Sequence, residues 1–305
     1  MSLAPIALFV YNRADHAKQT ITNLLKTAEA AHTDLYIFSD GPRSEKETVK
    51  VQEVRNYIHT VTGFASVTIV EQPKNIGLSR SILSGVSMVL DKHGKMIQID
   101  DDLIVSPWCL KYFNDALDHY EHDDRVACVC GFLYPVRKPV PPAFFMRGAD
   151  CAIWATWKRA WTIFEADGQK LLQEIEQRKL SFKFDFHGAY PYTQMLRDQI
   201  AGKNDSWAIR WHAAAFLQNK YTLYPGQSMA HNIGMDSSGT NCGTSSDYDV
   251  EVGTSPIPVE NLPVVQSPQA FRAFKDFFIG MNKYSWFKRK RKRFKRWVRY
   301  IFTGA

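Results

Sequence analysis

The sequence predicts an α/β fold built on an open, largely parallel β-sheet. The first hundred residues alternate between short apolar runs and stretches with helical spacing, and the apolar runs are continuous. Continuous apolar strands are typical of a parallel sheet whose two faces are covered by helices. With 45% hydrophobic and 23% charged residues, the 305-residue chain has the composition of a folded protein with room for one large domain or two smaller ones.

The predicted elements follow one another in β-α-β order. Four apolar runs are predicted strands: Pro5–Val10, Leu35–Phe38, Val67–Val70 and Met96–Ile99. The first predicted helix carries Ile21, Leu24, Leu25 and Ala28, and another begins near Gly77 with Ile82, Leu83, Val86, Val89 and Leu90 on one face. Ser39-Asp40-Gly41-Pro42 is a turn signal. Ser106 before Pro107 fits the N-cap and first position of a further helix.

The pattern changes after a fifth predicted strand, Val126–Phe132. Cys128 and Cys130 lie in this run, where a buried strand is favoured over a metal site because no CxxC or Cys/His cluster accompanies them. Trp154, Trp157 and Trp161 have the spacing of one helix face. Residues 236–268 are rich in Gly, Ser, Thr and Pro and are predicted to form a loop or lid.

Positive charge is concentrated at the C-terminus. The formal charge is +7, but ten Lys or Arg lie between Lys283 and Arg299, and no acid follows Asp276. Without this segment the chain has 28 basic and 31 acidic residues, a net charge of −3. The basic character therefore belongs to the tail, which also carries aromatic residues.

Targeting signals and disulfides are not indicated. Residues 1–12 lack the basic start and long apolar run of a signal peptide, and no window approaches the roughly 18 apolar residues of a membrane span. The five cysteines are odd in number and scattered. We therefore expect a cytoplasmic protein.

Polar residues follow three of the predicted strands: Asn12-Arg13, Asp40-Gly41 and Asp100-Asp101-Asp102. In an open parallel sheet, ligands bind beyond the carboxyl ends of the strands. We expect these groups to converge on one pocket for a polar ligand.

The aspartate triplet indicates a cation site. Three adjacent carboxylates repel one another, and a hard divalent ion offsets this repulsion while leaving room for phosphate oxygens. The alternative is a solvated acidic turn that caps the next helix. The apolar flanks, MIQI before and LIV after, favour the metal site.

Two common nucleotide-binding classes are disfavoured. The chain has no Gly-x-x-x-x-Gly-Lys-Ser/Thr loop, and no Gly-x-Gly-x-x-Gly follows the first strand. This argues against P-loop kinases and Rossmann dehydrogenases.

Several blocks, taken in order, resemble a known family. PIALFVYNR, SDGPR, KNIGLSRSI and QIDDDLIVSP resemble the nucleotide-sugar half of GT-A glycosyltransferases of the broad family 2 type, which assemble bacterial polysaccharides, and more distantly the eukaryotic N-acetylglucosaminyltransferases. IWATWKRAW, NDSWAIRW and YPGQSMAHNIGMDSSGTNC resemble their acceptor half. The resemblance covers roughly residues 4–245.

The resemblance implies a domain plan. It implies a GT-A catalytic domain over residues 1–265, with a nucleotide-sugar half (1–106) and an acceptor half with a lid loop (107–265). Residues 266–305 are expected to form a basic, aromatic helical appendage outside the resemblance. Phe271, Phe274, Phe277 and Phe278 open this segment.

The resemblance also implies roles for individual residues. Those expected at the nucleotide sugar are Asn12, Arg13, Asp40, Asn75, Gly77, Arg80, Asp100 and Asp101. Asp102 is the expected ligand of Mn²⁺ or Mg²⁺, and His231 is expected to reach the metal or the diphosphate. Arg80 as a surface residue and His231 as a structural one are the alternatives.

An inverting transfer needs a base for the acceptor hydroxyl. Asp205, before Ser206-Trp207, corresponds to the acid that precedes a Trp in the acceptor half of relatives. Asp198 and Asp185 are weaker candidates. The alternative for Asp205 is an N-cap of the helix that begins at Trp207.

Sugar contacts are predicted at Trp154 and Asn232. Trp154 is the choice for a stacking platform, although core packing explains at least two of the three tryptophans. Asn232, Gly234 and the Gly239-Thr240 loop are expected to form a lid over the donor, with a plain surface loop as the alternative.

The predicted function is an inverting, metal-assisted transfer of a hexose or N-acetylhexosamine, most readily from a UDP-sugar, to a saccharide or lipid-linked saccharide in lipopolysaccharide or capsule assembly. Residues 283–299 suit an anionic membrane surface, which implies a peripheral position on the inner face of the cytoplasmic membrane. A solvated or oligomer-contacting helix is an alternative, and nucleic acid is not expected as a partner. The rival functions are a sugar-phosphate nucleotidyltransferase and a non-catalytic, membrane-attached carbohydrate-binding protein.

Overall fold

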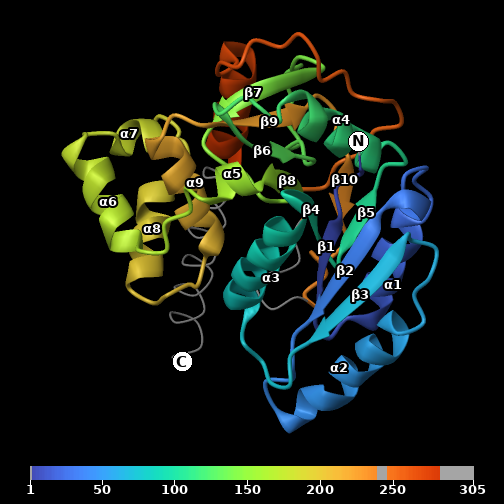
Figure 1. Cartoon of the computed structure of the whole chain (residues 1–305). Coiled ribbons are helices and arrows are strands. Elements are labelled where there is room, and N and C mark those ends of the chain that lie inside the picture. The colour runs from blue at the N-terminus through green and yellow to red at the C-terminus, as the bar shows by residue number, and fades with distance from the viewer. Residues whose placement is uncertain (1, 239–245, 282–305) are drawn as a thin grey trace, which may run out of the picture.

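The computed structural model describes residues 2–238 and 246–281. Its centre is an eight-stranded sheet with the order β3-β2-β1-β4-β8-β6-β9-β7 (Figure 1). Four of the seven strand pairings are parallel, and helices cover the sheet. The predicted α/β class is confirmed.

The first half of the sheet is entirely parallel. It consists of β1 (Ile6–Val10), β2 (Asp34–Ser39), β3 (Ser66–Glu71) and β4 (Lys95–Asp100), each within one or two residues of the predicted strand. These strands are joined by α1 (Ala14–Leu24), α2 (Glu45–Ile58) and α3 (Leu78–His93).

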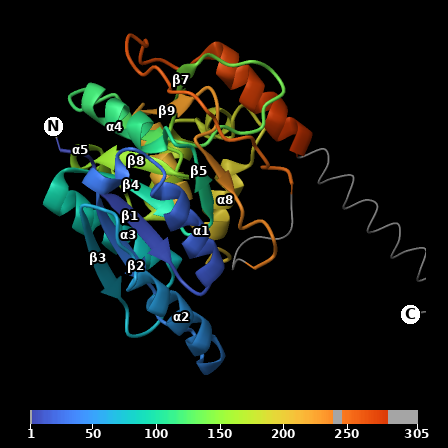
Figure 2. The same ribbon diagram turned by 90° about the vertical axis from the view of Figure 1, so that its right-hand side faces the viewer.

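The direction of strand addition places these helices. The chain steps outward from β1 to β2 and β3, then returns to place β4 on the other side of β1. Because parallel crossovers are right-handed, reversing the direction moves the connecting helix to the opposite face. Accordingly, α1 and α2 lie on one face and α3 on the other (Figures 1 and 2).

The second half of the sheet is mixed. It contains β6 (Val126–Cys130), β7 (Ala143–Arg147), β8 (Trp154–Trp157) and β9 (Tyr221–Pro225). Strand β8 runs antiparallel to both β4 and β6 and so joins the two halves. A separate ribbon pairs β5 (Leu103–Val105) with β10 (Ala230–Asn232), and α4 (Cys109–His119) lies between β5 and β6 in the chain.

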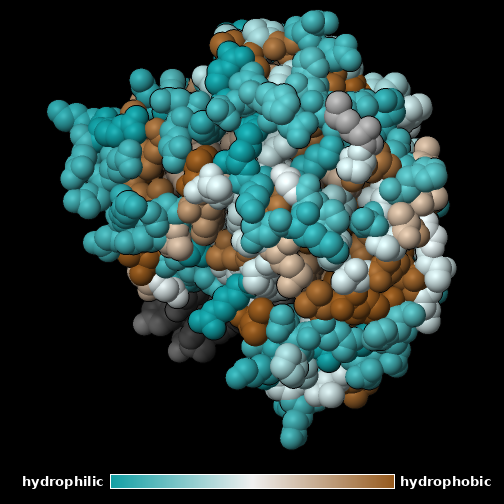
Figure 3. Space-filling model, in the orientation of Figure 1, coloured by the Kyte–Doolittle hydropathy of each residue, from teal (hydrophilic) through white to brown (hydrophobic). Residues whose placement is uncertain are grey.

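Five helices follow β8 without an intervening strand: α5 (Lys158–Trp161), α6 (Gly168–Gln177), α7 (Ser181–Phe184), α8 (Tyr192–Ile200) and α9 (Trp207–Leu217). The last four form a lobe at the left of Figure 1, whereas α5 lies beside β8. This lobe has a small core of its own, which includes Ile175, Phe184 and Leu196. Hydrophilic side chains cover most of its surface in Figure 3. Trp207 begins a helix, as predicted, and the cap is Ser206, whose Oγ accepts the Ile209 amide at 3.2 Å.

Residues 268–281 form a helix that packs on the second half of the sheet (Figure 2). The Phe274 ring lies 5.3 Å from Tyr224 and 5.7 Å from Phe144, and Phe274 belongs to the main core. Up to residue 281, the chain after the predicted boundary at 265 therefore shares the core of the sheet. The boundary does not separate two cores. The basic segment 283–299 lies outside the described residues, so the predicted appendage beyond 281 stays a prediction.

Two local predictions were wrong. Trp154, Trp157 and Trp161 do not share a helix face, because the first two lie in β8 and the third ends α5. The N-cap position of α4 is Trp108 and not Ser106, and no side chain caps the helix. Ser106 lies two residues earlier, where its Oγ accepts the Trp108 amide at 3.1 Å and donates to the Gly253 carbonyl at 2.6 Å. The prediction of a strand through Cys128 and Cys130 is confirmed.

Candidate functional site

The site lies where the strand order reverses, between β1 and β4. Neighbouring connections leave in opposite directions at such a point and open a crevice beyond the strand ends. Arg13 follows β1 and the aspartate triplet follows β4. The topology thus brings together the polar groups that follow these two strands.

Arg13 is the counter-charge of the triplet. Its Nη2 donates to Asp101 Oδ1 in a short contact and to Asp102 Oδ2 at 2.9 Å. The Arg13 side chain is 16% exposed, and both carboxylates are buried. Burial opposes the charge on Arg13, but the two carboxylates outweigh it and raise its pKa. An arginine therefore offsets the repulsion that, in the sequence, indicated a metal.

Burial still disfavours ionisation of the triplet. It raises the pKa of Asp100 to about 7, and the charges of Asp102 and Asp101 add to this effect. Burial also raises the pKa of Asp101 to about 6, against the attraction of Arg13. The raised pKa values of Asp100 and Asp101 thus come first from burial, which Arg13 opposes only in part.

Two residues that belong to no recognised sequence motif, Thr20 and Gly234, hold the triplet in position. The Thr20 hydroxyl of α1 donates to the Asp101 carbonyl at 2.8 Å and accepts the Leu103 amide at 3.0 Å. Gly234 packs so closely that a Cβ there would lie 2.0 Å from Asp102 Oδ2. Thr20 gave no signal in the sequence, and Gly234 had been predicted only as part of a lid.

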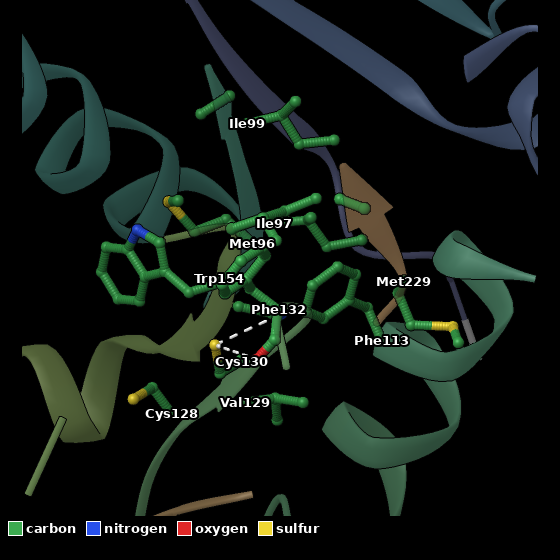
Figure 4. Close-up of a cluster of buried hydrophobic side chains, with 14 of the residues drawn as sticks. Met96, Ile97, Ile99, Phe113, Cys128, Val129, Cys130, Phe132, Trp154 and Met229 are labelled. Atoms are coloured by element: carbon green, nitrogen blue, oxygen red, sulfur yellow. Dashed lines mark hydrogen bonds between the residues drawn. The ribbon is translucent and has the colours of Figure 1, made fainter. Parts of the chain in front are cut away.

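Trp154 is a correction to the predicted stacking platform. Its side chain is 0% exposed and lies in the core beside Met96 (Figure 4). Its Nε1 donates to Gln98 Oε1 at 2.7 Å, and Gln98 Nε2 donates to Asp100 Oδ1 at 2.8 Å. Because the ring is fully buried, Trp154 cannot stack on a sugar. Its hydrogen bond to Gln98 instead helps to orient Asp100.

Asp40 organises the second wall of the site. Its carboxylate accepts the backbone amides of Gly41, Ile76 and Gly77 at 2.8–3.0 Å. Asn75 Nδ2 donates to the Gly41 carbonyl at 2.9 Å. These bonds tie the loop after β2 to the start of α3, so Asp40 shapes the pocket with its carboxylate already engaged by backbone.

These groups enclose a first cavity of about 250 Å³. Most of the predicted nucleotide-sugar residues line it: Asn12, Arg13, Asp40, Asn75, Asp100 and Asp101, together with Asp102 and Asn232. Tyr11, Arg43 and Leu78 also line it and were not predicted. Arg80 is exposed on α3 and is not among the lining residues, and Gly77 contributes through its backbone.

The predicted metal ligands do not share a face. Asn232 Nδ2 donates to Asp102 Oδ1 at 3.3 Å, so Asn232 faces the triplet. His231 precedes it in β10 and points to the opposite face, because side chains alternate along a strand. In residues 2–238 and 246–281, no group of three His, Cys, Asp or Glu is arranged to hold a metal ion. The carboxylates suit Mn²⁺ or Mg²⁺ chemically, but Arg13 engages two of them, and the site as formed does not fit a bound metal.

The predicted base is not at the cavity. Asp205 lies in the loop before α9 with its side chain 74% exposed, 3.9 Å from Arg210. Asp198 pairs with Lys203 at 2.9 Å, and Asp185 accepts the Thr193 amide at 2.6 Å. The assignment of a base to Asp205 stays a prediction.

A second cavity of about 290 Å³ adjoins the first, and Asn232 lines both. It lies in the second half of the chain and is rich in aromatic residues. One carboxylate lines it, Asp150, in the loop between β7 and β8. The sequence prediction missed Asp150, although it closely follows the apolar run Ala143–Met146, the same signal that identified Asp40.

Comparison with known proteins gives distant structural likenesses. No protein-family model and no curated protein sequence matches the chain. The mannosyltransferase PcManGT from Pyrobaculum calidifontis, solved with GDP-Man and Mn²⁺, is 11% identical, with 70% of this chain and 69% of that chain covered and a TM-score of 0.40. TarS of S. aureus is 15% identical over 48% of this chain and 24% of TarS, with a TM-score of 0.32.

A Desulfovibrio desulfuricans G20 protein, classed as a nucleotide-diphospho-sugar transferase, is 11% identical over 59% of this chain and 78% of its own, with a TM-score of 0.34. Likenesses this distant carry no argument about activity. The function is therefore inferred from the residues of the site itself.

No helix in the described ranges has the length and apolar character needed to span a bilayer.

Proposed function

We propose that this chain is a glycosyltransferase of the GT-A type that uses a nucleotide-diphosphate sugar. The observation that carries the proposal is the meeting of Arg13 and the aspartate triplet at the strand-order reversal, beside a cavity lined by polar groups from three strand ends. A nucleotide diphosphate needs donors for its phosphates, polar groups for its ribose and an apolar surface for its base. Arg13 and Arg43, Asn12 and Asn75, and Leu78 offer these three kinds of group.

The chain's own residues have distinct parts in this proposal. Arg13 and Arg43 attract the diphosphate, and the buried Asp101 and Asp102 hold Arg13 in a fixed orientation. Asp40 and Asn75 fix the loop that contacts the nucleotide. The Mn²⁺ or Mg²⁺ expected from the sequence to neutralise the leaving group stays a prediction, because Arg13 already engages two of the three carboxylates.

The finer proposal follows the sequence resemblance. It is transfer, with inversion, of a hexosyl or N-acetylhexosaminyl group from a UDP-sugar to a saccharide or lipid-linked saccharide in cell-surface polysaccharide assembly. A sugar-phosphate nucleotidyltransferase is disfavoured, because YNRADH after β1 is not a glycine-rich cationic loop. A non-catalytic carbohydrate-binding protein is the alternative that only turnover excludes.

A binding panel tests the nucleotide site. Thermal unfolding is measured with UDP-, GDP- and dTDP-sugars, with and without MnCl₂, because a ligand that binds only the folded state raises the melting temperature. We expect one nucleotide class to raise it and Arg13→Ala to abolish the rise. Release of the nucleotide diphosphate from the donor then distinguishes an enzyme from a non-catalytic binding protein. A panel in which no nucleotide sugar stabilises the chain contradicts the proposal.

The membrane part of the proposal concerns residues 283–299. Their ten cations and interleaved aromatic residues are suited to an anionic lipid surface, which would bring a lipid-linked acceptor to a cytoplasmic enzyme. Co-sedimentation with phosphatidylglycerol vesicles is expected for the full chain and not for a chain ending at residue 282. Equal binding to phosphatidylcholine vesicles would contradict this part alone.

A further inference from the structure

The second cavity has the chemical character of a sugar site. Besides the Asp150 carboxylate, five of its lining residues combine aromatic surface with polar atoms: Tyr134, Tyr190, Tyr192, His212 and Tyr248. A pyranose presents apolar C–H faces, which pack on aromatic rings, and hydroxyl groups, which need both donors and acceptors. A cavity with this lining can satisfy both requirements.

Asp150 is held in the cavity wall by uncharged donors. The hydroxyls of Tyr134 and Tyr224 both donate to its Oδ2 at 2.8 Å, and the Ala152 amide donates to Oδ1 at 3.2 Å. No Lys, Arg or His forms an ion pair with it within the described ranges. Because Oδ1 has only this one long bond, it keeps the capacity to accept a proton or a ligand hydroxyl.

The loop that carries Asp150 is fixed from α9. His212 Nδ1 donates to the Ala149 carbonyl at 2.7 Å, and a Cβ on Gly148 would lie 2.5 Å from the His212 ring. Gly148 also has φ +96°, which side chains other than hydrogen rarely allow. The position of the carboxylate is therefore set before any ligand binds.

The tyrosines around Asp150 remain donors. Burial, with the charge of Asp150 as a further cause, raises the pKa of Tyr134, Tyr190 and Tyr192. Burial likewise raises the pKa of Tyr248 to about 12. Their hydroxyls stay protonated at neutral pH and can donate to ligand oxygens or to Asp150.

The second cavity is close to the triplet. Asn232 donates to Asp102 and lines both cavities. Cys151, beside Asp150, also lines the second cavity, and burial together with the charges of Asp150 and Asp100 raises the pKa of its thiol. A ligand in the second cavity would thus face one held at the triplet.

We propose that the second cavity binds the acceptor sugar ring and that Asp150 receives the proton of its attacking hydroxyl. This inference rests on the proposed function and deepens it. The hydroxyl oxygen forms a bond to the anomeric carbon, while the bond from that carbon to the diphosphate oxygen breaks and its electron pair leaves with the nucleotide diphosphate. The hydroxyl proton passes to Asp150 Oδ1. Asp150 thereby takes the role that the sequence predicted for Asp205.

Asp150→Asn is the decisive variant, and Asp205→Asn is its matched control. An amide oxygen can accept both tyrosine hydroxyls, as Oδ2 does now, while the amide nitrogen in place of Oδ1 loses only the 3.2 Å bond from the Ala152 amide and cannot take up the proton. Circular dichroism and the melting temperature verify that both variants fold.

Binding is measured first, by saturation-transfer NMR with methyl glycosides of glucose, galactose and N-acetylglucosamine. We expect at least one glycoside to receive saturation in the wild type, about tenfold weaker binding in Asp150→Asn, and binding within about twofold of wild type in Asp205→Asn. UDP binding, measured by calorimetry, should be unchanged in both variants.

The controls distinguish failure of the inference about Asp150 from failure of the proposed function. If the wild type binds UDP but no glycoside contacts it, or if Asp150→Asn binds glycosides as the wild type does, the inference is wrong and the proposed function stands. If UDP, GDP and dTDP all fail to bind while glycosides do, the proposed function fails and the sugar cavity remains.

Turnover tests the proton transfer. With the donor and glycoside that give nucleotide release, Asp150→Asn should lower kcat by about 10²- to 10⁴-fold with little change in the donor KM. The acidic limb of the kcat/KM profile should disappear in this variant, which a merely structural residue would not cause. The reverse ranking, with Asp205→Asn inactive and Asp150→Asn active, would overturn the assignment.

Discussion

The two cavities hold carboxylates out of water by different means. At the triplet, Asp101 and Asp102 share the guanidinium of Arg13. In the second cavity, Asp150 has only neutral donors: two tyrosine hydroxyls and a backbone amide. The carboxylates of the first region belong to an ion pair, whereas Asp150 has no bonded counter-charge among the described residues. The first region therefore suits the binding of a charged ligand, and the second suits proton transfer.

The largest effect on stability is expected from Arg13→Ala, which removes the cation from the first region. Two buried carboxylates lose their partner, and breaking such a pair costs about 3–5 kcal/mol. Urea unfolding at neutral pH measures this loss. Arg43→Ala is the control, because Arg43 lines the same cavity but forms no ion pair with the triplet in the described residues.

The same variant tests whether the triplet can bind a metal ion. Without Arg13, the freed carboxylates should bind Mn²⁺, so MnCl₂ should raise the melting temperature of Arg13→Ala more than that of the wild type. An equal response would show that the triplet holds no cation other than Arg13.

The next effect is expected from Gly234→Ala. The added methyl would overlap Asp102 Oδ2, and forcing such a group into a packed site costs about 1–3 kcal/mol. We expect weaker nucleotide binding and a lower melting temperature. Gly280→Ala is the matched control, since no atom of residues 2–238 and 246–281 lies within 4 Å of its added carbon. Equal effects of the two changes would contradict the close packing of Gly234.

A similar or smaller effect is expected from Trp154→Phe. It removes the indole donor to Gln98 and leaves a buried acceptor unpaired, at a cost of about 1–3 kcal/mol. Trp108→Phe is the control, because Trp108 is partly exposed and water can replace its bond to the Thr254 carbonyl. If Trp154 contacted sugar, the variant would weaken glycoside binding; we expect that binding to be retained and stability to fall.

The smallest effect is expected from pH acting on the second region. Burial lowers the pKa of His212, so the folded protein keeps it neutral while the unfolded chain takes up a proton below its ordinary pKa of about 6.5. This contribution is present above that pH and is lost as the pH falls through it. Unfolding free energies between about pH 5 and 7.5 should therefore fall less on acidification in His212→Gln than in the wild type.

The first region was largely predictable because its signals are local. Continuous apolar runs gave β1 to β4, and the acids and amides directly after them gave most of the residues around the first cavity. The prediction of a helix through Trp154, Trp157 and Trp161 was wrong, because the i, i+3, i+7 spacing also arises when a short strand runs into a short helix. Periodicity alone does not distinguish these cases.

The second region depends on contacts between distant segments. Asp150 meets Tyr134 and Tyr224, which lie 16 and 74 residues away in the chain. Neither pairing leaves a motif, because each hydroxyl reaches the carboxylate only after β6, β7 and β9 have been assembled side by side.

The α/β class, the strand ends and the acidic triplet could thus be predicted from the amino-acid sequence, since strand burial and local polarity depend on neighbouring residues. The pairing of Arg13 with Asp101 and Asp102 became visible only in the folded chain. The tertiary structure also decided that Trp154 is buried and that Asp150 faces an aromatic cavity. The physical reason is that charge compensation and burial depend on which segments meet in space, and those meetings are fixed by the strand order of the sheet.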